Sequence, residues 1–164
     1  MLLMLVAMLA TAAAQQPVAE GLLLRGDELI AAGKPTQARA EYEKALHAGA
    51  KLQEDFIRSR NLGFAYLNGS PHDFAKASQW LGNASRLHSE DDEVRLALAQ
   101  ALTWSGNAAS ALPEWRALCV KNPQNTDYAI GLAGVLWKTG DRAGCFNHLQ
   151  HMVEASPSNI RLRL

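Results

Sequence analysis

Two segments of this 164-residue chain repeat one pattern of residues at an interval of thirty-four positions. The matching pairs are Leu102 and Leu136, Gly106 and Gly140, Ala111 and Cys145, and Trp115 and Leu149. A fixed interval of this length is typical of chains built from stacked units, because each unit can bury its apolar face only against the next one. The interval therefore constrains the fold more than any other feature of the sequence.

Two earlier copies extend the pattern toward the N-terminus. Their small residues at the corresponding place are Ala38 and Ala77. Ala77 lies thirty-four residues before Ala111, and the spacing between Ala38 and Ala77 is five residues longer. The surplus falls in residues 47–53 and 68–73, where Gly, Ser, Pro and Asp are typical of loops. The sequence thus predicts copies near residues 19–52, 56–91, 92–125 and 126–159, and the start of a fifth at 160–164.

Each copy has the pattern of two helices joined by a turn. Alanine and leucine dominate the apolar residues, which favours helix over strand. In the first copy we expect a helix near residues 20–32, ended by Gly33, and then a second helix with Ala38, Tyr42 and Ala45 at helical spacing. A Gly or Ala in the first helix lets the second approach closely, and a large residue such as Tyr42 fills the remaining gap. Pro123 and Pro157 end the third and fourth copies.

These features resemble the tetratricopeptide repeat family over residues 20–159. The resemblance implies an all-α, right-handed α-solenoid of about four helical hairpins, and a non-enzymatic, bacterial-type scaffold that binds other proteins. Ser59 and Arg95 stand where the family usually has a large apolar residue. Pro113 falls inside an expected second helix, so either that helix starts late with Ser110 as its N-cap, or it kinks.

The resemblance also implies that the first helices line a concave groove, which holds a segment of a partner protein. Large aromatic residues contribute much of the binding energy at interfaces, so Phe64, Trp104 and Trp137 are candidate anchors. The alternative is that the two tryptophans only pack helix against helix. The predicted partner-binding residues are Arg60, Phe64, Leu67, Gln100, Trp104, Ile130, Trp137 and Lys138, and further groove positions are Leu23, Asp27, Ile30, Asn68, Leu96, Thr103 and Gly134.

The kind of partner is left open by the sequence. One variety of the family grips a C-terminal carboxylate between Lys, Arg and Asn side chains, and only Arg60 and Asn61 come near that pattern, so we expect no such clamp. Tryptophan faces can also stack on sugar rings, which keeps a polysaccharide ligand open. Basic and acidic residues number sixteen each, so no excess positive charge points to nucleic acid.

The first fourteen residues have the composition of a secretory signal. Residues 2–10 are apolar and uncharged, and Ala12, Ala13 and Ala14 precede Gln15 as a small-residue cleavage site. The apolar run is too short to span a bilayer, which needs about 20 apolar residues. We therefore expect a signal peptide at 1–14 and an exported, periplasmic or secreted chain without a membrane span. The alternative is a buried N-terminal helix.

Few residues suggest chemistry. Cys119 and Cys145 could form one disulfide in an exported chain, or pack as two free thiols. Cys145, His148 and His151 follow one another at three-residue steps, but we expect both histidines to face outward beside a core cysteine. The acidic run at 90–93 is expected to cap a helix. We predict no catalytic, cofactor-binding or metal-binding site.

The C-terminal end of the pattern lacks a polar closing helix. Leu132, Leu136, Phe146 and Leu149 should then be partly bare. Either the sequence continues in a longer gene product, or the bare end self-associates, or residues 160–164 cover it incompletely. A chain that is the repeat region of a larger exported enzyme or of an outer-membrane or exopolysaccharide-export protein is the alternative function.

Overall fold

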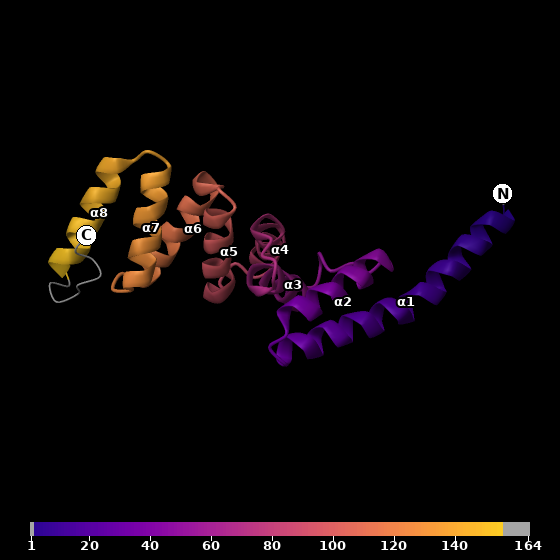
Figure 1. Cartoon of the computed structure of the whole chain (residues 1–164). Coiled ribbons are helices and arrows are strands. Elements are labelled where there is room, and N and C mark those ends of the chain that lie inside the picture. Colours follow the sequence, from indigo (N-terminus) through magenta and orange to yellow (C-terminus); the bar gives the residue numbers. More distant parts are fainter. Residues whose placement is uncertain (1, 156–164) are drawn as a thin grey trace. The chain divides into compact units, whose positions relative to one another are not determined.

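A computed structural model describes the backbone of residues 2–155 and the side chains of residues 16–154, and over that range the chain is all-α. The first compact unit, residues 1–89, contains α1 (Leu2–Ala31), α2 (Pro35–His47), α3 (Phe56–Asn68) and α4 (Phe74–Leu87). The second, residues 90–164, contains α5 (Asp92–Trp104), α6 (Ala108–Lys121), α7 (Thr126–Lys138) and α8 (Arg142–Ala155). Successive helices pair as hairpins within each unit (Figure 1), which confirms the all-α prediction of about four hairpins.

Glycines follow the first helix in three of the four hairpins, which confirms the predicted helix end at Gly33. Gly33, Gly106 and Gly140 have φ angles of 68°, 84° and 87°. L-residues with a side chain rarely adopt this left-handed conformation, whereas glycine does so at little cost. The turn between the two helices of these three hairpins therefore depends directly on a glycine at this position.

Short polar side chains begin most of the later helices. Asp55, Asp73 and Asp91 each accept a hydrogen bond from the backbone N–H three residues on, at 2.9–3.0 Å. Asn125 accepts from the backbone of Asp127 and Tyr128 in the same way. These bonds satisfy backbone donors that the first turn of a helix leaves without partners. The expectation that the acidic run at 90–93 caps a helix is confirmed at Asp91.

In the first unit, glycines let paired helices come into close contact. A Cβ atom on Gly26 would lie 2.7 Å from the Tyr42 ring, and one on Gly63 would lie 2.7 Å from Leu81 Cγ. Tyr42 and Leu81 are both fully buried. The predicted pairing of a small residue on one helix with a large residue on the next is therefore confirmed in both hairpins of this unit.

In the second unit, the same close contact links one hairpin to the next. A Cβ on Gly131 of α7 would lie 2.5 Å from the ring of Trp115 on α6. Trp115 is 5% exposed, and its Nε1 donates to Thr103 Oγ1 at 3.0 Å, so the ring is held in place. The core around it contains Ala99, Ala111, Leu118, Leu132, Ala133, Val135, Leu136 and Cys145.

Ser59, at a position where a large apolar residue was expected, holds the long connection between α2 and α3 in place. Its hydroxyl is fully buried and donates to the carbonyl of Leu52 at 2.7 Å. The same oxygen accepts from Asn83 Nδ2 at 2.9 Å, and Asn83 also donates to the carbonyl of Gln53 at 2.8 Å. The inserted residues are thus held by α3 and α4, and their buried polar groups are satisfied.

Two other departures from the family pattern are resolved in the second unit. Arg95 on α5 lies 3.9 Å from Glu114 on α6, so a charge pair stands where an apolar contact was expected. The interpretation that α6 starts late, with Ser110 as N-cap, is wrong because the helix begins at Ala108. Pro113 lies within it at an exposed position, where water can satisfy the carbonyl that proline leaves without an N–H donor.

The N-terminal helix is longer than the sequence predicted. α1 runs from Leu2 to Ala31 with Pro17 inside it, and its N-terminal part extends past α2 (Figure 1). Side chains before Gln16 lie outside the described residues, as does the expected fifth copy at 160–164, so signal cleavage after Ala14 stays a prediction. None of the described helices is both long and apolar enough to cross a bilayer.

Two glycines on α7 provide a matched test of the close contacts. We expect Gly131→Ala to destabilise the chain by about 1–3 kcal/mol, because the new methyl group overlaps the fixed Trp115 ring. Gly134→Ala should instead stabilise it by roughly 0.5–1 kcal/mol, since nothing lies within 4 Å of its Cβ position and alanine favours helix. Urea unfolding followed by tryptophan fluorescence measures both, and equal effects would contradict the contact.

Candidate partner-binding site

The predicted groove residues of the first unit are only partly accessible. Phe64 is half-buried, and the guanidinium of Arg60 lies over its ring, 5.0 Å from the ring centre. Leu67 and Leu23 are each 5% exposed, so both side chains belong to the core. The inclusion of Leu67 among the contact residues therefore needs correction, whereas the predicted residues Arg60 and Phe64 on the same helix remain partly accessible.

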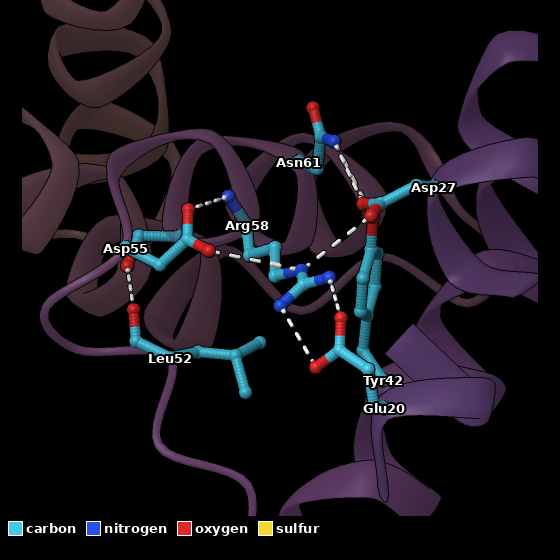
Figure 2. A network of polar contacts seen from close by, with 8 residues as sticks. Glu20, Asp27, Tyr42, Leu52, Asp55, Arg58 and Asn61 are labelled. Carbon is cyan, nitrogen blue, oxygen red and sulfur yellow. Dashed lines mark hydrogen bonds and ion pairs between the residues drawn. The ribbon is translucent and has the colours of Figure 1, made fainter. Parts of the chain in front are cut away.

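Asp27 and Asn61 are engaged by the chain itself (Figure 2). Asp27 accepts from the Tyr42 hydroxyl at 2.5 Å, from Asn61 Nδ2 at 3.3 Å and from Arg58 Nε at 3.4 Å. Arg58 also donates to Glu20 at 2.6 Å, so one guanidinium ties α3 to two carboxylates of α1. Burial and the bond to Asp27 raise the pKa of Tyr42 far above its usual value. Asn61 is 7% exposed, so its amide is poorly placed for a carboxylate clamp.

In the second unit, two tryptophans lie exposed on adjacent helix ends. Trp104 on α5 is 53% exposed and Trp137 on α7 is 57% exposed. Lys138 Nζ donates to the carbonyl of Thr103 at 3.2 Å, so the last turns of α5 and α7 lie next to each other. The interpretation that both tryptophans only pack helix against helix does not fit these exposures. Gln100 and Ile130 are half-buried nearby on the same two helices.

A cavity of about 520 Å³ opens beside Trp137, between α7 and α8. Its lining is almost entirely apolar, and three predicted residues, Ile130, Trp137 and Lys138, are part of it. The remaining lining residues are Ala133, Gly134, Arg142, Cys145, Phe146 and Leu149. The Arg142 guanidinium lies 4.7 Å from the centre of the Trp137 ring, so the cavity has an apolar floor and a cationic rim.

Arg142 and Phe146 line this cavity but were not among the predicted contact residues, although Phe146 was expected to be partly exposed. Phe146 is 68% exposed and Leu149 half-buried, whereas Leu132 and Leu136 are 7% and 5% exposed. The prediction of a bare end thus holds for α8 and is wrong for the two leucines of α7, which are buried in the core that joins α7 to α5 and α6. The available signal was that Phe146 lies thirty-four residues after Leu112, a core residue.

The two cysteines and His148 have partly or fully buried side chains on α6 and α8. Both thiols are free, with Cys145 buried and Cys119 half-buried, and burial raises the pKa of Cys119 to about 11. Among the described residues no group of three His, Cys, Asp or Glu side chains is arranged to hold a metal ion. His148 was expected to face outward, but its Nε2 is buried and without a hydrogen-bond partner in the described part of the chain.

Comparison with known proteins identifies the fold. The chain resembles YrrB, described as a TPR protein with an unusual peptide-binding site, with 19% identity, a TM-score of 0.69, and coverage of 88% of this chain and 72% of that one. It also resembles MamA of strain AMB-1, with 18% identity, a TM-score of 0.67, and coverage of 90% and 78%. The chain has the tetratricopeptide-repeat fold.

The likeness to solved structures concerns architecture. MamA from Desulfovibrio magneticus RS-1 is 14% identical, with a TM-score of 0.64 over 93% of this chain and 79% of that one. No protein-family model matches the sequence. No curated protein matches it either. The chain thus shares the tetratricopeptide-repeat fold with these proteins at a sequence identity below 20%.

The half-buried imidazole of His148 leads us to expect that stability depends on pH. Burial lowers its pKa below the ordinary value of about 6.5, and the nearby His151 adds to the effect. The unfolded chain then binds the proton more readily, so the free energy of unfolding should fall as the pH drops below about 6.5. We expect His148→Gln to show a smaller loss between about pH 7.5 and 5 than wild type.

Urea unfolding at the two pH values, followed by tryptophan fluorescence, measures this difference. His151→Gln is the control, since His151 is exposed on the same helix and should retain most of the dependence. An identical pH dependence in His148→Gln and wild type would show that His148 does not contribute.

Proposed function

We propose that the chain is a non-enzymatic scaffold that binds an extended or helical segment of a partner protein. The observation that carries the proposal is the pair of exposed indoles, Trp104 and Trp137, on the adjacent ends of α5 and α7. Exposing two large apolar rings to water is unfavourable, and tryptophan is enriched among residues that dominate binding energy. A segment that covers them both would recover this apolar burial.

The surroundings of the two indoles suggest the chemistry of that segment. The floor beside Trp137 is apolar, and Lys138 and Arg142 supply positive charge at its edge. An apolar segment with acidic residues on one side would complement this surface. The peptide-binding site named for YrrB, which has the same fold, supports a peptide ligand as the class to test first.

The paired tryptophans can be tested with a selected peptide. A phage-displayed library of random peptides is first selected on the wild-type chain, and the Kd of the best peptide is measured by fluorescence polarisation. We expect Trp104→Ala/Trp137→Ala to weaken binding by about 2 kcal/mol or more, roughly thirtyfold in Kd.

Val120→Ala is the matched control, because Val120 is 83% exposed on α6, outside the proposed contact surface. It should retain the wild-type Kd, and circular dichroism should show the same helicity for all three proteins. Unchanged affinity in the double variant would refute the contact surface.

We further propose that the chain acts outside the cytoplasm. The support is the apolar run at 2–10 followed by three alanines at 12–14. The intact mass of the native protein, purified from its own cells, tests this directly: we expect the mass of a chain that begins at Gln15. A native protein that retains residues 1–14 would contradict cleavage at this place.

A further inference from the structure

The cavity between α7 and α8 is equivalent, in the repeat pattern, to the surface of α5 and α6 on which α7 packs in the same unit. We call this cavity the seat. The core that joins α7 to α5 and α6 includes Leu96, Ala99, Ala108, Ala111, Leu112 and Trp115. The residues thirty-four positions later are Ile130, Ala133, Arg142, Cys145, Phe146 and Leu149. All six line the 520 Å³ cavity. The cavity thus has the position and lining of a seat for one more helix, packed as α7 packs.

The opposite end of the chain carries a helix face of the corresponding kind. α1 and α7 share a register of 107 residues, because Gly33 and Gly140 both end their helices with a positive φ and Ala38 aligns with Cys145. The residues of α1 equivalent to Tyr128, Gly131, Leu132, Val135, Leu136 and Thr139 of α7 are Gly21, Leu24, Arg25, Glu28, Leu29 and Ala32. These six line a shallow hollow of about 460 Å³ on α1, where Leu24 is 53% exposed.

We propose that the α7–α8 seat binds α1 of a second copy of this chain. The two faces differ from the internal pair in complementary ways. Inside the unit, Gly131 on the incoming helix makes room for Trp115, whereas between copies Leu24 would meet the smaller Leu149. The smaller side chain in the seat, Leu149 in place of Trp115, is thus matched by a larger side chain on the incoming helix, Leu24 in place of Gly131.

The charges of the two faces also match. The incoming helix has Glu28 where α7 has Val135, and the seat has Arg142 where α6 has Ala108. Lys138 adds a second cation to the rim of the seat. Arg25 on the same face of α1 is exposed, and its stem can lie along the apolar floor while its charge stays in water.

Such a contact is heterologous, because the two partners use different surfaces. Each bound pair leaves one α1 face and one seat unoccupied, so further copies can add. The seat shares Trp137, Lys138 and Arg142 with the surface proposed above for the partner segment. The face of α1 that contains Leu24 belongs only to the contact between copies, so variants of Leu24 test this proposal separately.

Two single variants of the full chain test the contact by complementation. Leu24→Asp puts a charge on the binding face of α1 and leaves the seat unchanged. Phe146→Asp puts a charge in the seat and leaves the face of α1 unchanged. Both residues are more than half exposed, so folding should survive, as circular dichroism can verify. We expect wild type to sediment as a concentration-dependent series of oligomers and each variant alone as a monomer. The mixture of the two should form a one-to-one heterodimer and nothing larger.

Val120→Asp, at an exposed position on α6, is the control and should associate as wild type does. A wild-type chain that stays monomeric at every concentration would overturn the proposal. This result is expected if residues 156–164 cover the seat of their own copy. Folded single variants that still self-associate, or a mixture that forms no heterodimer, would also overturn it.

Discussion

Close contact between helices at small residues is the constraint on which the structure depends. Gly26 admits the Tyr42 ring, Gly63 admits Leu81, and Gly131 admits the Trp115 ring at distances where any added side-chain atom would overlap. Short helices such as these, with 13 or 14 residues from α2 onward, are marginal alone and gain their stability from neighbours. The spacing between helices therefore decides which side chains are buried and which remain for binding.

The two units reach the same hairpin architecture with different chemistry. In the first, polar side chains make several of the contacts between elements: the buried Ser59 holds the α2–α3 connection, and the half-buried Arg58 bridges α1 and α3 through Glu20 and Asp27. Each buried group has its partners, so the desolvation cost is compensated. The second unit keeps an apolar core around Trp115 and leaves apolar residues exposed on α5, α7 and α8.

Those uncovered residues carry both proposals. Trp104 and Trp137 point to a partner segment, and Phe146 with Leu149 to another helix. The two surfaces meet at Trp137, where Arg142 lies over the indole. A chain assembled through its seat would thus place Glu28 of the next copy close to the site proposed for the partner segment, so occupancy of one surface should influence the other.

Local and periodic features were determined by the sequence itself. The thirty-four-residue interval gave the hairpins, the positive-φ glycines gave three turns, and Asp91 gave a cap, because each depends on residues near one another in the chain. What depends on distant residues was decided only by tertiary structure: Leu67 and Asn61 are buried in the first unit's core, α6 starts at Ala108 rather than after Ser110, and Nε2 of His148 is buried. A helical pattern tells which face is apolar, whereas burial depends on which neighbour lies against it. For α8 of this chain, the sequence indicated which residues would be exposed, and only the packing of α7 on α5 and α6 showed that the cavity they line is equivalent to an occupied one.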